Sequence, residues 1–352
     1  MDTRPINTDE LLQEALRVTS EPCEYFSEEQ IHGLLTGRPL EYYQFVKDEL
    51  TGIAEGSLQL ELPAKQVFPD PGAGSDFRVM PCIVRGRKKV RKTVKIVGTN
   101  TLQQLVPDQI TVGKAFALHP EENFVSHVFD ACLLSSARTG ICSTIAIDLL
   151  STAREKITIY GAGRVGYYAA FYAASLGGVS EISIIDRDPD RAARSASLLG
   201  SQLPSVRFSA ADKEDAVVDT DVLILATTST TPVCSPPGPG ANLIISLGAD
   251  TDHQQELAPE WAGVADIFVD TDDCVRFGDI RAWQKAGLIP VGQKITGLLE
   301  LLRNGAPSAG AAKKQRVFIS TGSALFDNLT IGYLLGRTRN DPTGKGGGRS
   351  CA

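Results

Sequence analysis

The sequence of 352 residues lacks several features that would mark a membrane, secreted or metal-binding protein. No apolar run approaches the roughly 20 residues that a membrane-spanning helix needs. The first residues carry acids and no apolar core, so we expect no secretory signal peptide and a cytoplasmic location. The seven cysteines form no CxxC pair and the four histidines are scattered, so we expect no metal site.

The chain also lacks an excess of positive charge. Its 42 acidic residues outnumber its 35 basic residues, which gives a net charge of −7. Because nucleic acids and membrane surfaces are themselves anionic, this balance argues against both as partners. We therefore expect a small-molecule partner.

The most informative pattern is a glycine turn between two apolar strands. A β-branched run, residues 157–160, leads into GAGRVG, a helix of small residues follows, and a second apolar strand ends at Asp186. Gly161 allows the tight turn, Gly163 lets the backbone approach a pyrophosphate, and Gly166 lets helix and strand pack closely. The helix N-terminus offers unpaired N–H groups to the phosphates. This arrangement predicts a dinucleotide-binding site.

Asp186 favours NAD over NADP, because a carboxylate there accepts hydrogen bonds from the ribose hydroxyls and would repel a 2′-phosphate. Arg187 follows directly and could hold that phosphate, so NADP is the alternative. The candidate cofactor residues are Gly161, Gly163, Arg164, Val165, Gly166, Asp186, Arg187, Thr227, Gly248 and Gly322.

Strands and helices alternate from residue 157 to about 290, which predicts a doubly wound parallel sheet of the Rossmann type. Before it, Ser27 and Gln30 form a capping-box pattern for a helix, and residues 40–56 continue as a helix. Four strands follow between residues 58 and 118, and then a long helix over 125–152. The glycine-rich tail, 338–352, is expected to be disordered.

Several separated motifs together resemble the ornithine cyclodeaminase/mu-crystallin family. They are Lys65 after Leu62-Pro63, Met80-Pro81, Lys95 in TVKIVG, the run 135–140 (SSARTG), the glycine turn, Gly248-Ala249-Asp250 with Glu256-Leu257, and Gly322 with Asp327. The resemblance covers roughly residues 40–336. It implies a Rossmann domain, 138–319, inserted into an α+β substrate and dimerisation domain with a mixed sheet, 1–137 plus 320–352, and a homodimer.

Three basic residues are candidates for binding a carboxylate. Arg138 lies among small and apolar residues, where an unpaired guanidinium is costly, and such an arginine usually grips a carboxylate or forms a structural ion pair. Lys95 sits in an otherwise apolar strand and is expected to point inward, although it could be one more exposed lysine. The resemblance implies that Lys65, Lys95 and Arg138 hold the α-carboxylate of an amino or imino acid.

Asp250 follows the strand over 243–247, at the edge of a parallel sheet where ligands bind. Beside a nicotinamide it could exchange a proton with the substrate nitrogen, or it could merely cap the next helix. The family usually continues Pro-Gly-Lys after this residue, whereas here the sequence is Thr251-Asp252-His253. His253 is either a second titratable group near the substrate or a surface residue.

Arg78 distinguishes two chemistries. Ornithine cyclodeaminases place a glutamate two residues before the Met-Pro pair, and here that position is Arg78, a cation that cannot accept a proton. With Lys65 it adds positive charge, which suits a substrate with more than one carboxylate. The pattern looks closer to the family's amino-acid dehydrogenases and imine reductases, including those that form 2,3-diaminopropionate.

The first hypothesis is therefore an NAD(H)-dependent oxidoreductase acting on a carbon–nitrogen bond, with Asp250 and Lys95 as the catalytic residues. One alternative is an NAD-dependent cyclodeaminase that releases ammonia without net redox change. Another is a nicotinamide-dinucleotide-binding protein without turnover, similar to mu-crystallin.

Overall fold

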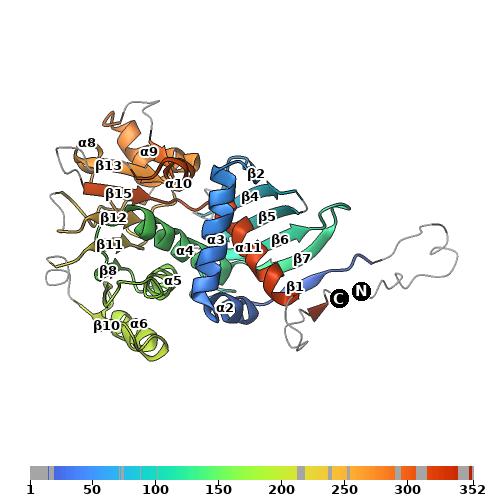
Figure 1. The fold of residues 1–352 in the computed structure, drawn as a ribbon, viewed down its shortest axis with the longest axis horizontal. Helices are drawn as coiled ribbons and strands as arrows, with labels where there is room; N and C mark the ends of the chain where they lie inside the picture. Colours follow the sequence, from blue (N-terminus) through green and yellow to red (C-terminus); the bar gives the residue numbers. More distant parts are fainter. Residues whose placement is uncertain are drawn as a thin grey trace. The chain divides into compact units, whose positions relative to one another are not determined.

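The computed structural model describes residues 15, 20–70, 72, 75–87, 89–100, 102–211, 219–236, 240–251, 254–289, 295–306, 315–339 and 349–350. These residues form two compact units (Figure 1). Unit 1 comprises Met1–Gly37, Gln59–Leu134 and Asp327–Ala352, and unit 2 comprises Arg38–Leu58 and Ser135–Phe326. Two of the four boundaries fall inside helices, α4 (Cys132–Leu150) and α11 (Ala324–Arg339).

Unit 1 is built on a mixed sheet of eight strands. Along the sheet the order is β16 (Arg349–Ser350), β1 (Glu24–Phe26), β7 (Val125–Asp130), β6 (Thr111–Leu118), β5 (Val90–Thr99), β4 (Ser75–Arg85) and β2 (Gln59–Glu61), with β3 (Gln66–Asp70) also paired to β4. Among the strands that the structure describes in this sheet, only β1 and β7 pair in parallel. Helix α2 (Glu28–Thr36) begins at the capping box of Ser27 and Gln30, as the sequence predicts.

Helix α11 packs on one face of this sheet, and Asn328 makes several of its polar contacts with the strands. The Asn328 side-chain amide donates to the Cys82 carbonyl of β4 at 3.2 Å and to Thr93 Oγ1 of β5 at 2.9 Å. Buried side chains alternate along β4 and β5, as expected for strands with one covered face.

Unit 2 is built on eight parallel strands (Figure 1). Their order is β10 (Arg207–Ala210), β9 (Glu181–Ile185), β8 (Lys156–Tyr160), β11 (Val222–Leu225), β12 (Leu243–Ser246), β15 (Gln315–Ile319), β13 (Ala265–Val269) and β14 (Thr296–Gly297). Among the residues that the structure describes, this unit contains the start of α11, most of α4, the 3₁₀ helix η1 (Asp272–Arg276) and helices α3 (Pro39–Ala54), α5 (Arg164–Ala173), α6 (Pro189–Gln202), α8 (Trp261–Val264), α9 (Gly278–Lys285) and α10 (Leu298–Asn304).

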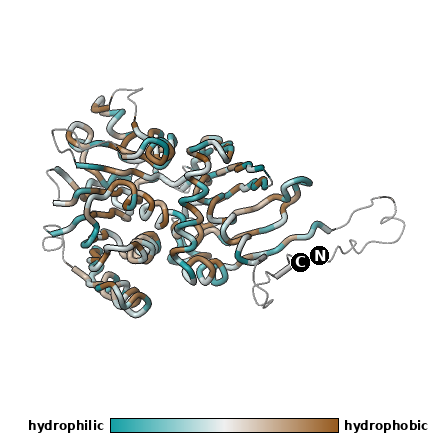
Figure 2. The backbone as a smooth tube through the Cα atoms, viewed as in Figure 1, coloured by the Kyte–Doolittle hydropathy of each residue, from teal (hydrophilic) through white to brown (hydrophobic). Residues whose placement is uncertain are grey.

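The central strands β11 and β12 consist almost entirely of buried Val, Leu and Ile, and their hydropathy can be followed in Figure 2. Strands covered on both faces carry continuous apolar runs of this kind. The strand order reverses between β8 and β11, where the chain first builds outward through β9 and β10 and then returns. The predicted fold class, a doubly wound parallel sheet with an additional mixed-sheet α+β region, is confirmed.

The structure corrects two of the predicted elements. Residues 125–130, predicted as the start of a helix, form β7, because they complete hydrogen-bonded ladders with β1 and β6. The helix begins only at Cys132. Helix α11 runs to Arg339, into the tail predicted as disordered from residue 338, and most of the rest of that tail lies outside the described residues.

Residues 38–58, assigned from the sequence to the substrate domain, belong to unit 2. Helix α3 packs there against α5 and α10. The Tyr42 ring meets Tyr172 of α5 edge-on, with centroids 5.5 Å apart, and Arg303 of α10 donates from Nε to the Ala54 carbonyl at 2.8 Å. The remaining predicted domain boundaries stay a prediction.

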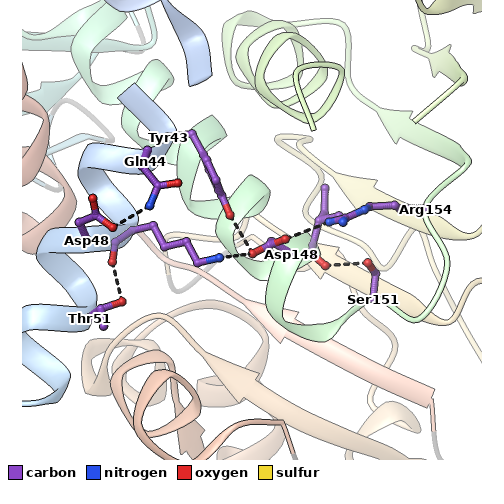
Figure 3. Close-up of polar contacts among 9 residues, drawn as sticks. Tyr43, Gln44, Asp48, Thr51, Asp148, Ser151 and Arg154 are labelled. Atoms are coloured by element: carbon purple, nitrogen blue, oxygen red, sulfur yellow. Dashed lines mark hydrogen bonds and ion pairs between the residues drawn. The ribbon is translucent and has the colours of Figure 1, made fainter. Parts of the chain in front are cut away.

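Asp148 of α4 joins α3 to the same unit (Figure 3). Its carboxylate accepts hydrogen bonds from Tyr43 Oη at 2.7 Å, Lys47 Nζ at 2.6 Å and Arg154 Nη1 at 3.1 Å. Burial alone would raise the pKa of Asp148, but the donated hydrogen bonds outweigh burial and lower it. Burial and Asp148 together raise the pKa of Tyr43 to about 12.

Helix α4 is long and apolar enough to cross a membrane by length and composition alone. Within the described part of the chain it is the one helix of this kind, and 83% of its apolar window is buried inside the protein. Burial of this extent is the pattern of a core helix.

We predict that Asp148→Asn lowers the free energy of unfolding by about 1 to 3 kcal/mol at pH 7, because three donors lose a charged acceptor. Because the folded-state pKa of Asp148 is lowered, its stabilisation is present above the unfolded-state pKa and disappears as pH falls through the folded-state pKa. Urea unfolding at pH 7 and in acid should therefore show a difference that shrinks in acid.

The matched control is Asp48→Asn on α3, where an exposed carboxylate accepts a hydrogen bond from Gln44 at 2.7 Å (Figure 3). An exposed contact of this kind contributes no more than about 0.5 kcal/mol. Equal losses in the two variants would contradict the role given to Asp148.

Candidate functional site

The glycine turn joins β8 to α5 at the point where the strand order reverses. Gly161 has a φ of +106°, and a Cβ there would collide with the Ala226 carbonyl at the end of β11. A Cβ on Gly166 would collide with the Gly161 carbonyl. Gly163, in contrast, has no atom within 4 Å of where its Cβ would lie. Packing therefore demands two of the glycines, whereas Gly163 leaves open backbone at the helix N-terminus, as an approaching pyrophosphate requires.

Asp186 lies directly after β9 and folds back onto this turn. Its Oδ2 accepts a hydrogen bond from the Ala162 backbone N–H at 2.7 Å, and its Oδ1 accepts one from the Asp188 N–H at 3.0 Å. Arg187, which lies between Asp186 and Asp188 in the sequence, is exposed. Asp186 and the glycine turn thus come together as the sequence predicts. Two further candidate cofactor residues, Arg164 and Val165, lie in the first turn of α5.

Two other candidate cofactor residues lie at neighbouring strand ends. Thr227 follows β11 and Gly248 follows β12, and a Cβ on Gly248 would collide with the Thr227 carbonyl. Glu256, which the sequence analysis noted only as part of a motif, joins the two. Its side chain is fully buried and accepts hydrogen bonds from the Thr227 N–H at 2.6 Å and the Gly248 N–H at 2.8 Å. Burial raises the pKa of this carboxyl, and the donated hydrogen bonds oppose the rise.

Asp250 lies two residues beyond Gly248 and is partly exposed. With its amide oriented to satisfy its neighbours, Gln254 donates to the Gly248 carbonyl at 3.2 Å and to Asp250 Oδ1 at 3.1 Å. Gln254 therefore donates a hydrogen bond to the Asp250 carboxylate, a contact that no sequence pattern revealed. His253 lies outside the described residues.

Arg138 lies inside α4, 8% exposed, with Gly322 against its guanidinium. Gly322 has a φ of +78°, and a Cβ there would lie 2.7 Å from Arg138 Nη2. The nearby Asp270 is buried and accepts hydrogen bonds from Ser320 Oγ at 2.6 Å and Cys274 Sγ at 2.9 Å. Burial raises the pKa of Asp270, and the positive charge of Arg138 opposes that rise. Gly322 is thus placed to make room for Arg138, and Asp270 to balance its charge.

The other three candidate cations belong to unit 1 and are all buried. The register of β4 and β5 puts Arg78 and Lys95 on one face of the mixed sheet. Lys95, 2% exposed, contacts both carboxylate oxygens of Asp327 at 2.9 and 2.8 Å. Arg78 makes a two-point contact with Asp76, 2.7 Å from Nε and 3.1 Å from Nη2.

Lys65 precedes β3 and is 3% exposed although its neighbours Ala64 and Gln66 are exposed. The expectation that Lys95 points inward is confirmed. The predicted substrate site thus draws Lys65, Arg78 and Lys95 from unit 1 but Arg138 and Asp250 from unit 2. Their convergence on one substrate stays a prediction.

Among the described residues no group of three or more His, Cys, Asp and Glu side chains is arranged to hold a metal ion. In unit 2, the glycine turn after β8 and a carboxylate, Asp250, lie at the carboxyl edge of one parallel sheet. Such an edge can hold a nicotinamide cofactor and present an acid–base group to its substrate.

Solved structures with this fold include nicotinamide-dependent enzymes. The Thermococcus litoralis Δ1-pyrroline-2-carboxylate reductase, in complex with NADH and L-proline, has a TM-score of 0.77 at 19% identity, over 88% of this chain and 95% of that chain. An archaeal alanine dehydrogenase dimer with bound NAD has a TM-score of 0.78 at 21% identity, over 94% and 99%. The iminosuccinate reductase of Paracoccus denitrificans, in complex with NAD⁺, has a TM-score of 0.73 at 20% identity, over 91% and 97%.

No protein of curated function matches the sequence significantly. The sequence model of one family does match, and it matches residues 36–339, most of the chain. With the fold, the glycine turn and the order of the motifs in agreement, the chain belongs to the ornithine cyclodeaminase/mu-crystallin family.

Proposed function

We propose that the protein is an NAD(H)-dependent oxidoreductase that acts on the carbon–nitrogen bond of a small amino or imino acid. One observation carries the proposal: the carboxyl edge of a single parallel sheet holds both the glycine turn with its acid, Asp186, and a partly exposed carboxylate, Asp250, which Gln254 contacts. The first group suits cofactor binding, and the second suits proton transfer to or from a substrate nitrogen.

The residues of unit 2 fit the cofactor. Gly163 and the N-terminus of α5 would face the pyrophosphate, and Asp186 would accept hydrogen bonds from the ribose. Thr227, Gly248 and Gly322 would line the nicotinamide end. When bound, NAD supplies the acceptor or donor of a hydride at the substrate Cα.

The substrate would be held by its carboxylate. Arg138, Lys95 and Lys65 are the proposed ligands, because a planar guanidinium and buried ammonium groups suit a carboxylate. Asp250 would take the proton released from the amine as the imine forms, and return it in the reverse direction. Gln254 donates a hydrogen bond to Asp250 and would orient its carboxylate toward the substrate nitrogen.

Arg78 is paired with an acid, as Lys95 is. Its two-point contact with Asp76 balances its charge locally, as the contact with Asp327 does for Lys95, so neither side chain brings excess positive charge. A second carboxylate on the substrate is therefore less strongly indicated than the sequence alone suggested. The contact of Arg78 with Asp76 supports a reductase over a cyclodeaminase, because the side chain at this position is an engaged cation rather than an available base.

The decisive experiment is a screen of NADH oxidation with keto acids plus amines, and of NAD⁺ reduction with amino acids. We expect a net absorbance change at 340 nm with at least one substrate. Asp250→Asn should lower kcat by roughly 100-fold or more, because it removes the acid–base group, and should leave NADH affinity within about twofold. Ammonia release from a diamino acid without net redox change would instead establish a cyclodeaminase.

The control is Asp272→Asn, which removes an exposed carboxylate from the same unit and should leave kcat unchanged. If Asp250→Asn turns over like the control, Asp250 is not the acid–base group.

We propose NAD rather than NADP as the cofactor, because both oxygens of Asp186 lie at the turn where a 2′-phosphate would meet them. Asp186→Ser should raise the affinity for NADPH relative to NADH by about tenfold or more, since it removes the like charge and leaves the exposed Arg187. Fluorescence titration of both cofactors measures this ratio. An unchanged ratio would contradict the assignment.

We also propose a cytoplasmic homodimer. Phe68, Phe77 and Ile96 lie on the mixed-sheet strands β3 to β5 and are between 42% and 48% exposed, and the first two stack with centroids 4.6 Å apart. An exposed apolar patch of this kind marks an interaction surface. Analytical ultracentrifugation should give a molecular mass twice that of the chain. The Phe77→Asp variant should have a mass closer to that of the monomer. A monomeric wild type would refute the dimer.

A further inference from the structure

Three buried polar side chains form a chain of contacts beneath the edge of the parallel sheet. They are Ser246 at the end of β12, Glu256 after the Asp250 segment, and Asp279 in the first turn of α9, each no more than 1% exposed. None of the roles assigned so far uses Asp279 or Ser246. All three residues belong to unit 2.

Glu256 is surrounded by donors. Its Oε1 accepts hydrogen bonds from the Thr227 N–H at 2.6 Å and the Thr227 hydroxyl at 2.9 Å. Its Oε2 accepts from the N–H groups of Leu247 at 3.1 Å and Gly248 at 2.8 Å. Such a set of donors stabilises a carboxylate in its ionised form.

Asp279 has a different environment at each oxygen. Its Oδ1 accepts from the backbone N–H groups of Glu256 at 3.0 Å and Leu257 at 3.1 Å. Its Oδ2 lies 3.0 Å from the Ser246 hydroxyl oxygen, which also lies 2.8 Å from Glu256 Oε2.

The number of hydrogens decides the protonation state. A serine hydroxyl has one hydrogen and so can donate to only one of the two carboxyl oxygens. If both carboxyls were ionised, one of these two buried oxygen–oxygen contacts would have no hydrogen between its atoms. One carboxyl must therefore carry a proton. Asp279 Oδ2 is the favoured place for it, because Glu256 Oε2 already accepts hydrogen bonds from two backbone N–H groups.

We infer that Asp279 is a protonated positioning residue, which donates to Ser246, which in turn donates to the ionised Glu256. Through Glu256, this relay holds the strand ends that carry Thr227 and Gly248. The inference deepens the proposed function, because these strand ends are where the nicotinamide would lie.

The surroundings of Asp279 agree with this assignment. Burial raises its pKa to about 7, the Leu257 N–H opposes the rise, and the negative charge of Glu256 adds to it. Of the other charged side chains of η1 and α9, Asp272, Arg276, Arg281 and Lys285 are exposed, and Asp273 is paired with Arg276 at 3.1 Å. Glu256 is therefore the titratable group that faces it from the adjoining segment.

The test replaces each carboxyl by its amide. In Asp279→Asn the amide N–H can donate to Ser246 as the protonated acid does, and the carbonyl can still accept from the backbone, so NADH affinity should stay within about twofold of wild type. In Glu256→Gln one side-chain oxygen becomes an NH₂ group that meets N–H donors. The dissociation constant for NADH should then rise about tenfold or more, or the protein should lose thermal stability.

A pH series separates this protonation from a merely structural role. Because the folded-state pKa of Asp279 is raised, its proton favours the folded state at low pH, and this contribution is lost as pH rises through about 7. Asp279→Asn cannot titrate. Relative to this variant, the wild-type unfolding equilibrium should shift toward unfolding by about 100-fold between pH 5 and pH 8, measured by thermal melts of both proteins.

The opposite pattern would overturn the inference: Glu256→Gln tolerated and Asp279→Asn destabilising, or a stability difference between wild type and Asp279→Asn that does not change with pH. The pH series needs no cofactor. If the protein does not bind NADH, the proposed function fails, while the melts still decide the protonation of Asp279.

Discussion

Backbone N–H groups beyond the ends of parallel strands have no partner in the sheet, and this constraint shapes the candidate site. Each such group must find an acceptor when it is shielded from water. Here buried or half-buried acids supply the acceptors: Asp186 for the turn after β8, and Glu256 for the segments after β11 and β12. The same acids hold in place the backbone that would contact the dinucleotide. Their hydrogen bonds therefore both stabilise this edge of the sheet and set its geometry for binding.

Buried charge is the second constraint. Lys95 contacts Asp327, Arg78 contacts Asp76, and Arg138 lies near Asp270. A buried cation without an opposite charge is costly, and each of these three cations has an acid in its own unit. A substrate carboxylate would then approach a nearly neutral pair, and the geometry of the donors would contribute more to its recognition than net charge.

The sequence predicts those parts of the site that depend on neighbours in the chain. The glycine turn, the strand before it and Asp186 form one continuous unit, so their types and order were sufficient to predict their arrangement. The inward position of Lys95 was predicted because this last cation of a basic run stands between apolar residues of a strand, Val94 and Ile96. The predicted start of α4 was wrong. The apolar residues of 125–130 fit the spacing of a helix as well as that of a strand, and only their pairing with β1 and β6 decides for the strand.

Contacts between distant segments account for what the sequence could not supply. Asp279 accepts a hydrogen bond from the backbone N–H of Glu256, which is 23 residues away in the sequence. Asp327 contacts Lys95, which is 232 residues away. The residues next to these acids in the sequence do not indicate that they are buried. Asp279, for example, lies in the first turn of a short helix, a position where many exposed acids occur. The assignment of α3 to unit 2 has the same origin, because the three donors to Asp148 become neighbours only when α3 and α4 pack together. Motifs therefore predict where the cofactor would bind, whereas the acids that hold the motifs in place become visible only in the folded chain.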